Sequence, residues 1–480
     1  MVRLRLETDT PGFFGDICEV VRLFWPGAAI ALDQGERVLR HTHQRQGDQW
    51  IERWQLEEHQ AAYQAPAVEG GLAEKRCLKR AVKTGCFLLM RQMTGVNPPW
   101  GSLTGIRPTR LLYEALGQGM SLEEGTDWLC RTFFVSPDKA LLLRDILAAQ
   151  RGLVEPGPGR FDVYVGIPFC VTRCAYCSFA SGELGDGQLV EPYLEALLRE
   201  MEACARLTAS LGLSPRAFYM GGGTPTALTA AQLSRVLEAA RRLFPGCVEW
   251  TVEAGRPDTI QRDKLLALKA AGVGRISVNP QSFSDETLAR IGRAHTAAET
   301  VGAFALAREM GFDNINMDLI AALPGEDLSA FAYSLDRCLA LAPESVTVHT
   351  LAIKRSSRLH EAGYTQSDSG AAARMVDLAR SRLAGAGYQP YYLYRQKYMA
   401  DNLENVGYAL PGRACLYNIG NMEETAPVLA LGAGAITKWL FPRERRIERA
   451  PNVKNIQEYI ARVDEMVQRK YLLIEGGTHP

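Results

Sequence analysis

The chain has 480 residues, too many for one ordinary domain, and 47% of them are hydrophobic, as in a globular protein with a substantial core. Lys plus Arg and Asp plus Glu number 54 each, so the overall charge points neither to nucleic acid nor to an acidic membrane surface. No secretory pattern opens the chain, and the longest apolar run, residues 426–437, is too short to span a bilayer. With 11 scattered cysteines, we expect a protein of the reducing cytoplasm that has no membrane span and binds no nucleic acid.

Residues 1–155 are predicted to form a separate α+β domain whose role the sequence does not indicate. Strand patterns occur at 2–7 and 29–32, and helical patterns at 15–24, 73–93, 109–116 and 121–151. The Pro/Gly-rich segment Glu155-Pro-Gly-Pro-Gly-Arg160 predicts a linker to the next domain.

After the linker, short β-type runs alternate with longer helical runs, which predicts parallel strands joined by right-handed crossovers. The strand patterns lie at 162–167, 217–220, 249–254, 275–279, 314–320 and 345–351. The helical patterns between them lie at 189–210, 230–244, 258–271, 296–310 and 327–340. Six units are too few for a complete eight-unit barrel, so we predict an α/β fold with an open, partial (β/α)6 barrel over 156–440. Residues 441–480 are predicted to be a short helical tail with one amphipathic helix at 456–470.

Three cysteines, Cys170, Cys174 and Cys177, follow the first predicted strand of the barrel. Soft thiolates suit iron–sulfur clusters, zinc or copper(I), and an iron–sulfur cluster normally takes four cysteine ligands. Three ligands on one loop would leave one iron of a [4Fe–4S] cluster open to another ligand. The alternatives are three buried structural thiols, or a zinc site whose fourth ligand lies elsewhere; the second cysteine pair that is usual in zinc loops is not visible in the sequence. We favour the cluster.

Polar or glycine-rich segments also fall at the ends of the later predicted strands, where barrels of this kind place their chemistry. Gly221-Gly-Gly-Thr-Pro-Thr226 follows the second strand, and glycines let backbone groups approach a ligand closely. Glu253 ends the third strand, Gln281 follows the fourth, and Asp318 lies on the fifth. Each alone is compatible with a turn or a helix cap, but together they indicate a ligand site. His295 is interpreted as a cap or a supporting residue rather than as a metal ligand.

The collinear segments YVGIPFC, GGGTPT, NPQSF, NMDLIAALP and GAGA resemble the oxygen-independent coproporphyrinogen III dehydrogenase (oxidase) family of radical S-adenosylmethionine (SAM) proteins, which also includes heme chaperones. The resemblance covers residues 161–440. The N-terminal segment PWGSLTGIRPT resembles the longer branch of this family, which has an extra N-terminal domain.

The resemblance implies a [4Fe–4S] cluster held by Cys170, Cys174 and Cys177. It implies a bound SAM, whose contacts would be Tyr164, Tyr176, Gly222, Gly223, Thr224, Glu253 and Ile436. The coproporphyrinogen enzyme binds a second SAM, and the positions that match its contacts are Gln281, Arg293, Asp318 and Ala352. Whether this chain binds one SAM or two stays open, and no catalytic residue is identified.

The reaction that the resemblance implies is oxidative decarboxylation of the tetrapyrrole coproporphyrinogen III during heme biosynthesis. A 5′-deoxyadenosyl radical takes hydrogen from the β-carbon of a propionate, and loss of CO2 and one electron leaves a vinyl group; two rounds give protoporphyrinogen IX. A one-electron donor such as flavodoxin or ferredoxin is an expected partner. A tetracarboxylate substrate requires cations, and the candidates, each also compatible with a solvated surface, are Lys354, Arg355, Arg358, Arg395 and Lys397.

Three differences from the family weaken the case for assigning the substrate of the coproporphyrinogen enzyme to this chain. Phe179 stands where the coproporphyrinogen enzyme has a fourth cysteine, Gly166 replaces a histidine, and the long C-terminal domain of that enzyme has no counterpart. The heme chaperones share an aromatic residue at position 179, but their H-N-x-x-Y-W heme-binding motif corresponds here to Tyr417-Asn-Ile-Gly-Asn-Met422, without the histidine or the two aromatics. We therefore favour the enzyme over a heme chaperone, and a methyltransferase of anaerobic heme degradation is a further alternative.

Overall fold

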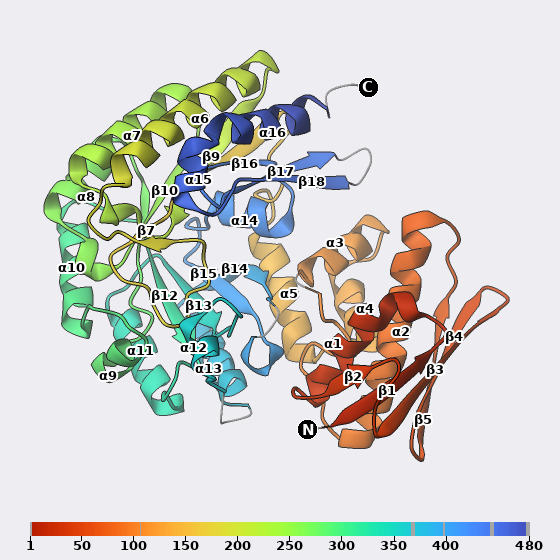
Figure 1. The fold of residues 1–480 in the computed structure, drawn as a ribbon. Helices are drawn as coiled ribbons and strands as arrows, with labels where there is room; N and C mark the ends of the chain where they lie inside the picture. The colour runs from red at the N-terminus through yellow and green to blue at the C-terminus, as the bar shows by residue number, and fades with distance from the viewer. Residues whose placement is uncertain (1, 106, 366–369, 397–398, 442–445, 477–480) are drawn as a thin grey trace. The chain divides into compact units, whose positions relative to one another are not determined.

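The computed structural model describes residues 2–105, 107–365, 370–396, 399–441 and 446–476 (Figure 1). The chain folds into two compact units, Met1–Arg144 and Asp145–Pro480, each built on a sheet of its own. The division falls within helix α5 (Pro137–Ala149), whereas the sequence predicted it at the Pro/Gly-rich segment after residue 155. That segment connects α5 to the first strand of the second unit, so it separates two elements rather than two units.

The first unit contains a five-stranded sheet with the order β2-β1-β3-β4-β5. Its strands are β1 (Arg3–Thr8), β2 (Ala29–Ala31), β3 (Arg37–Gln46), β4 (Gln49–Leu56) and β5 (His59–Pro66). Strand β1 pairs in parallel with β2 and β3, and β3, β4 and β5 form an antiparallel meander. The meander was not predicted from the sequence, although the two-residue connection Gly47-Asp48 between β3 and β4 is a hairpin signal.

The helices of the first unit lie where the sequence predicted them. They are α1 (Phe14–Phe24), α2 (Gly71–Thr94), α3 (Thr109–Gly117), α4 (Leu122–Phe133) and the first part of α5, with a 3-10 turn, η1 (Pro11–Phe13), before α1. Helices α1 and α2 pack against the strands through a core that includes Leu4, Val21, Trp54 and Phe87. This unit therefore buries an apolar core of its own.

The second unit is built on an eleven-stranded sheet with the order β14-β15-β13-β12-β11-β10-β9-β6-β16-β17-β18. The predicted barrel strands are confirmed as β6 (Arg160–Ile167), β9 (Ser214–Gly222), β10 (Glu249–Gly255), β11 (Arg275–Val278), β12 (Ile315–Ala321) and β13 (Ser345–Thr350). Neighbours among them pair in parallel. They form the predicted open, partial barrel, and the connecting helices lie on its outer side (Figure 1).

Both ends of the sheet carry strands that the sequence analysis did not predict. Beside β6, the sheet continues through a parallel strand and an antiparallel hairpin, β16 (Val428–Leu431), β17 (Ile436–Phe441) and β18 (Arg446–Pro451). Beside β13, it continues through two antiparallel strands, β15 (Asn405–Ala409) and β14 (Gln389–Tyr394). The short strands β7 (Phe169–Cys170) and β8 (Gly182–Glu183) pair separately. The tail therefore contains a strand as well as the predicted helix.

The connecting helices are α6 (Val190–Ser210), α7 (Ala230–Leu243), α8 (Arg262–Ala270), α10 (Ala297–Glu309) and α11 (Leu328–Ala340). Thr229 and Thr296 each form a capping box, so α7 and α10 begin where the sequence predicted. Helix α8 begins later than predicted, because Pro257–Thr259 form a 3-10 turn (η3) and Arg256 holds the Asp258 carboxylate. Further elements are α9 (Asp285–Arg290), α12 (Arg358–Glu361), α13 (Ala371–Gly385), α14 (Leu416–Glu423), η2 (Pro225–Ala227) and η4 (Ala400–Asn402).

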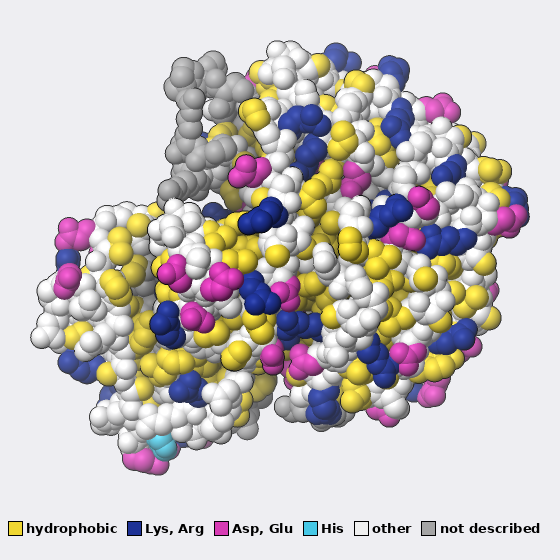
Figure 2. Space-filling view, turned by 180° about the vertical axis from the view of Figure 1, so that it is seen from behind, with side chains coloured by type: hydrophobic (Ala, Val, Ile, Leu, Met, Phe, Trp, Pro, Cys, Tyr) yellow, Lys and Arg dark blue, Asp and Glu magenta, His cyan; other side chains and the backbone are white. Residues whose placement is uncertain are grey.

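The predicted C-terminal helix is present as α15 (Ile456–Ala461) and α16 (Val463–Glu475), which are interrupted at Arg462. Both pack against α6. Within the described ranges, no helix combines the length and the apolar character needed to cross a membrane. On the face shown in Figure 2, acidic and basic side chains are interspersed, as the equal numbers of the two charges suggest.

Candidate active site

The cysteine loop lies at the C-terminal end of β6. Cys170 ends β7, which pairs with β8, and the backbone N–H of Cys177 donates to the carbonyl of Cys174 (3.1 Å). Loops from three other strands hold this loop in place. Ala175 donates its N–H to Ile291 (2.9 Å) and accepts one from Leu359 (3.0 Å), and the Arg256 side chain donates to the carbonyl of Thr172 (3.0 Å).

The thiols of the loop are partly exposed and close enough to influence one another. Burial raises the pKa of the Cys177 thiol, and the neighbouring Cys174 and Cys170 raise it further. In the part of the chain that the structure describes, no three His, Cys, Asp or Glu side chains converge closely enough to hold a single metal ion. A [4Fe–4S] cluster does not need such convergence, because each of its cysteines binds a different iron.

The glycine-rich segment after β9 runs directly beside the cysteine loop. The N–H of Gly223 donates to the carbonyl of Ile167 (2.8 Å), that of Thr224 to Phe169 (2.8 Å), and Thr224 Oγ1 lies 3.6 Å from Cys170 Sγ. A Cβ on Gly223 would lie 2.6 Å from the oxygen of Phe169, so only glycine fits. Because these N–H groups are occupied, the segment would contact a ligand through its carbonyl oxygens, which suit an ammonium group.

Glu253 of β10 faces the same end of the barrel. Its Oε1 accepts a hydrogen bond from the Tyr219 hydroxyl (2.5 Å), and a Cβ on Gly221 would lie 2.6 Å from its Oε2. Burial raises the pKa of Glu253 to about 7, although the Tyr219 hydrogen bond opposes the shift. The rings of Tyr164, Tyr219 and Tyr417 stack beside this carboxyl group, with the closest centroids, those of Tyr219 and Tyr417, 4.5 Å apart. Neither Tyr219 nor Tyr417 was predicted as a contact of the bound ligand, because the partners of their side chains lie elsewhere in the chain.

Asp318 of β12 and Gln281 form a second group at this edge. Gln281 bridges to β12, donating its N–H to the Asp318 carbonyl (2.9 Å) and adopting a positive φ of 69°. The Asp318 carboxylate accepts from Asn316 Nδ2 (2.7 Å) and lies 3.6 Å from His349 Nε2. The side-chain oxygen of Gln281 is buried without a hydrogen-bond partner among the described residues, so it is available to a ligand.

Arg293 joins this end of the barrel to the cysteine loop. Its guanidinium donates to the Tyr176 hydroxyl through Nη2 (3.3 Å), while Nε and Nη1 are buried with no hydrogen-bond partner in the described ranges. His295 is buried nearby, and burial together with Arg293 lowers its pKa to about 4. Thr296, not His295, caps α10, which leaves His295 as a neutral neighbour of Arg293. A buried guanidinium with unpartnered N–H groups fits an acceptor-bearing ligand.

The turn between β16 and β17 borders the cysteine loop on another side. A Cβ on Gly432 would lie 2.6 Å from the oxygen of Gly166, and one on Gly434 would lie 2.9 Å from Ala180 Cβ. Ile436 begins β17 and is 49% exposed, so its side chain is open to contact. Ala352, the remaining predicted SAM contact, follows β13 and forms a bridge with Met399.

The predicted substrate cations do not form one group. Lys354 lies near Cys177, and burial lowers the pKa of its ammonium group. Arg355 is exposed, whereas Arg358 is paired with Glu183 (3.0 Å). Arg395 is 3% exposed and donates to the carbonyl of Asn402 (2.8 Å), which is a structural role. Lys397 lies outside the described residues.

The residues that depart from the family are also placed. Phe179 is 69% exposed beside the cysteine loop. Helix α14 carries the stretch that corresponds to the heme-binding motif, and its side chains are engaged: Tyr417 is in the aromatic stack, Asn418 donates to the Tyr391 hydroxyl (3.3 Å), and Asn421 accepts from Lys438 Nζ (2.9 Å). The stretch is thus part of the packing of the second unit.

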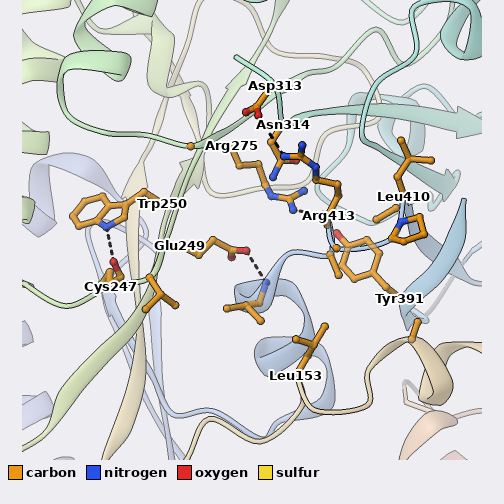
Figure 3. A pocket seen from close by; sticks show the side chains of 18 of the residues that line it. Leu153, Cys247, Glu249, Trp250, Arg275, Asp313, Asn314, Tyr391, Leu410 and Arg413 are labelled. Carbon is orange, nitrogen blue, oxygen red and sulfur yellow. Dashed lines mark hydrogen bonds and ion pairs between the residues drawn. The ribbon is translucent and has the colours of Figure 1, made fainter. Parts of the chain in front are cut away.

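A pocket of about 640 Å³ lies at the opposite, N-terminal ends of the strands (Figure 3). Its polar lining is used to hold the fold. Glu249, at the start of β10, accepts the N–H groups of Leu416 (2.9 Å) and Tyr417 (3.2 Å), and Arg275 donates to Ser345 Oγ (3.1 Å). The lining contains none of the predicted site residues, so the pocket is distinct from the candidate site.

Comparison with known proteins supports the prediction that the strand ends belong to a radical SAM fold. The radical SAM superfamily profile matches residues 164–338, which include the cysteine loop and the strands β9 to β12. The chain is 38% identical over 416 residues to the oxygen-independent coproporphyrinogen-III oxidase-like protein HemZ of Bacillus subtilis, covering 84% of this chain and 83% of that protein. It is 30% identical over 286 residues to the heme chaperone HemW of Escherichia coli, covering 59% and 71%. In fold it is similar to the coproporphyrinogen III oxidase HemN of Escherichia coli, with a TM-score of 0.53 at 24% identity over 68% of this chain and 73% of that one.

A parallel partial barrel with a three-cysteine loop at its C-terminal edge is thus a radical SAM fold. Within that class, the chain belongs to the oxygen-independent coproporphyrinogen-III oxidase-like family. The family implies a [4Fe–4S] cluster and SAM, and the residues present fit both. Three soft thiolate donors suit the cluster, while the glycine segment and the unpartnered groups of Gln281 and Arg293 suit a ligand with ammonium, carboxylate and hydroxyl groups.

Proposed function

We propose that this protein oxidatively decarboxylates propionate side chains of coproporphyrinogen III to vinyl groups, producing protoporphyrinogen IX for heme biosynthesis. One observation favours this activity over that of a heme chaperone. The match to the coproporphyrinogen-III oxidase-like relative spans 416 residues, more than the second unit contains, so it extends into the first unit; the match to the E. coli heme chaperone spans 286. The coproporphyrinogen-III oxidase-like relative is similar over parts of both units, so its activity is the better guide to the function of this chain.

In this proposal, Cys170, Cys174 and Cys177 hold the cluster, and the glycine segment with Glu253 holds the methionyl part of SAM. When bound, these cofactors supply radical chemistry that removes a hydrogen atom from a C–H bond. The side chains orient the reactants and exclude water. Glu253 has a pKa of about 7, and an approaching cation would favour its charged form, which anchors that cation.

The substrate would be met at the same edge by Lys354 and Arg355, which lie just beyond the end of β13. A propionate carboxylate near Lys354 would restore the ammonium form that burial disfavours. The proposed partner for reduction is a one-electron donor of the flavodoxin or ferredoxin type. Gln281, Arg293, Asp318 and Ala352 are proposed to contact a second SAM if one binds.

The test is anaerobic reconstitution with SAM, a reductant and coproporphyrinogen III, followed by mass spectrometry. We expect 5′-deoxyadenosine together with products that have lost one and then two CO2. Formation of 5′-deoxyadenosine without loss of CO2 from coproporphyrinogen III would refute the decarboxylase and keep the radical SAM assignment. A methylated tetrapyrrole would instead support the methyltransferase alternative.

The second candidate is a heme chaperone, because the heme chaperone of Escherichia coli is 30% identical over 286 residues of the chain. The engaged side chains of α14 argue against it, since Tyr417, Asn418 and Asn421 all have partners within the fold. Heme titration of cluster-free protein separates the two. Tight stoichiometric binding without turnover of coproporphyrinogen would favour the chaperone.

A further inference from the structure

A buried ion pair joins the C-terminal helix α16 to helix α6. Lys470 Nζ of α16 donates to Glu200 Oε1 of α6 (2.7 Å), and both side chains are fully buried. Removing two charges from water is costly, and a well-packed apolar pair is often as stable or more so. Stability alone is therefore a weak explanation for such a pair, and the contacts that the pair makes indicate its role.

The Glu200 carboxylate is fully hydrogen-bonded, and one of its donors is the turn before β17. Oε2 accepts the Gly432 N–H (2.8 Å) and the Tyr459 hydroxyl (2.6 Å), and Oε1 also accepts Asn452 Nδ2 (2.8 Å). Lys470 in turn donates to Asn452 Oδ1 (2.5 Å). The Asn452 amide donates to the carbonyl of Gly432 (2.8 Å), so both backbone groups of Gly432 are fixed.

This network is connected to the candidate active site. The Tyr193 hydroxyl donates to the carbonyl of Gly166 (2.5 Å) and accepts the Ala433 N–H (3.2 Å). There is no room for the turn to move inward, because a Cβ on Gly432 would meet both Tyr193 Oη (2.5 Å) and the Gly166 oxygen (2.6 Å). The turn is thus held between the end of β6, which leads into the cysteine loop, and the buried pair.

We propose that Glu200 and Lys470 are positioning residues that hold the 432–436 turn, and with it Ile436, at the nucleoside edge of the SAM site. The C-terminal helix α16 thereby sets the geometry of the site through one ammonium group. The proposal rests on the proposed function, because Ile436 is a SAM contact only in a radical SAM enzyme.

The test compares Lys470→Met with Arg216→Met. Arg216 pairs with Asp162 (2.7 Å), also buried and in the same unit, but at the N-terminal ends of β6 and β9. Both substitutions remove one buried cation and leave a carboxylate, so both lower stability. Hydrogen–deuterium exchange of residues 432–436 is measured on protein without cofactors, and the Kd for SAM is measured on the reconstituted protein.

We expect Lys470→Met to increase deuterium uptake at Gly432 and Ala433 and to raise the Kd for SAM about tenfold or more, since small displacements at a site are costly. Arg216→Met should leave both unchanged. Folded Lys470→Met with wild-type exchange and Kd would overturn the proposal, as would equal changes in the two variants. If Lys470→Met does not fold, Tyr459→Phe, which removes only one hydroxyl donor to Glu200, carries the same test with a smaller expected effect. Wild-type protein that binds no SAM would refute the proposed function, while the exchange measurement would still decide whether Lys470 holds the turn.

Discussion

At the scale of single residues, the site depends on groups that the fold only partly satisfies. The thiols of the cysteine loop are partly exposed, and Arg293 and Gln281 bury polar atoms without partners among the described residues. Unsatisfied buried polar groups cost free energy, and a ligand bound at this end of the barrel would complete those of Arg293 and Gln281. The elevated pKa of Glu253 belongs to the same pattern, because burial there disfavours the charge that a cationic ligand would restore.

Replacing Cys174 with Ala removes one of the three proposed cluster ligands. We expect Cys174→Ala to lose SAM cleavage and most of its iron after reconstitution. Cys247→Ala, which lies outside the loop, should keep both and serves as the control. The iron content of each protein is measured, and 5′-deoxyadenosine is measured by chromatography. If Cys174→Ala still cleaves SAM, the cluster assignment is wrong.

Glu253→Gln is expected to change how stability depends on pH. The folded pKa of about 7 exceeds the ordinary value of 4.5, so between these values the folded state binds more protons and stability falls as pH rises. Gln carries no charge and can still accept the Tyr219 hydrogen bond, so the variant should be more stable than wild type by roughly 1–3 kcal/mol at pH 8 and about equal at pH 5.

The measurement is urea denaturation of cofactor-free protein at both pH values. Glu286→Gln, an exposed carboxylate paired with Arg290, should change stability by less than about 0.5 kcal/mol at either pH. If the free energies of unfolding of Glu253→Gln and wild type differ by the same amount at pH 5 and at pH 8, the pKa of Glu253 is not raised in the folded protein.

At the scale of elements, the site is assembled from strand ends rather than from any one segment. The end of β9 lies against the cysteine loop because Gly223 and Thr224 continue the hydrogen bonding of β6 and β9 beyond the sheet. Glycine is required at this position, since a side chain would collide with the carbonyl oxygens of Ile167 and Phe169.

Gly223→Ala should therefore displace the cysteine loop. A Cβ 2.6 Å from the Phe169 oxygen must push the backbone apart, at a cost of about 1–3 kcal/mol and with a reduced yield of cluster. Gly274→Ala is the matched control, because nothing lies within 4 Å of its Cβ. Iron and sulfide per chain and the free energy of unfolding are measured, and a normal cluster in Gly223→Ala would contradict the close approach.

At the scale of the whole molecule, the two units carry separate cores. Phe87 packs with Phe24 and Phe134 in the first unit, and Phe218 stacks on Trp250 in the second. All three proposed cluster ligands and all predicted SAM contacts lie in the second unit. Binding of SAM should therefore depend on the second core.

Substituting these two phenylalanines tests that separation. Phe87→Ala and Phe218→Ala should each cost about 3–5 kcal/mol in their own unit, since both side chains are almost fully buried. Hydrogen exchange resolved by peptide shows which unit has lost stability. The affinity for SAM should fall only for Phe218→Ala. An equal loss of affinity in Phe87→Ala would show that the first unit supports the site.

What could be predicted from the sequence was what is local in it. The cysteine spacing, the glycine segment and the six barrel strands each occupy a few consecutive residues, and the structure places them as predicted. In the meander β3 to β5, β3 was missed because it is mostly polar. At the two ends of the large sheet, β15 and β16 join β13 and β6, partners that are distant along the chain. A separate N-terminal region was predicted over residues 1–155, and the two compact units divide after residue 144, within α5.

By itself, the sequence determined the chemistry available to this protein: three thiols on one loop, glycines where a ligand must come close, and carboxylates on two of the barrel strands. Only the tertiary structure decided which side chains meet. The Tyr219–Glu253 hydrogen bond spans 34 residues, the Arg293–Tyr176 contact 117 and the Lys470–Glu200 pair 270. Such contacts depend on how the strands and helices pack, and hydrophobicity patterns along the chain do not encode the partner of a polar group. For that reason the sequence alone predicted a site, while the fold shows which side chains lie around it.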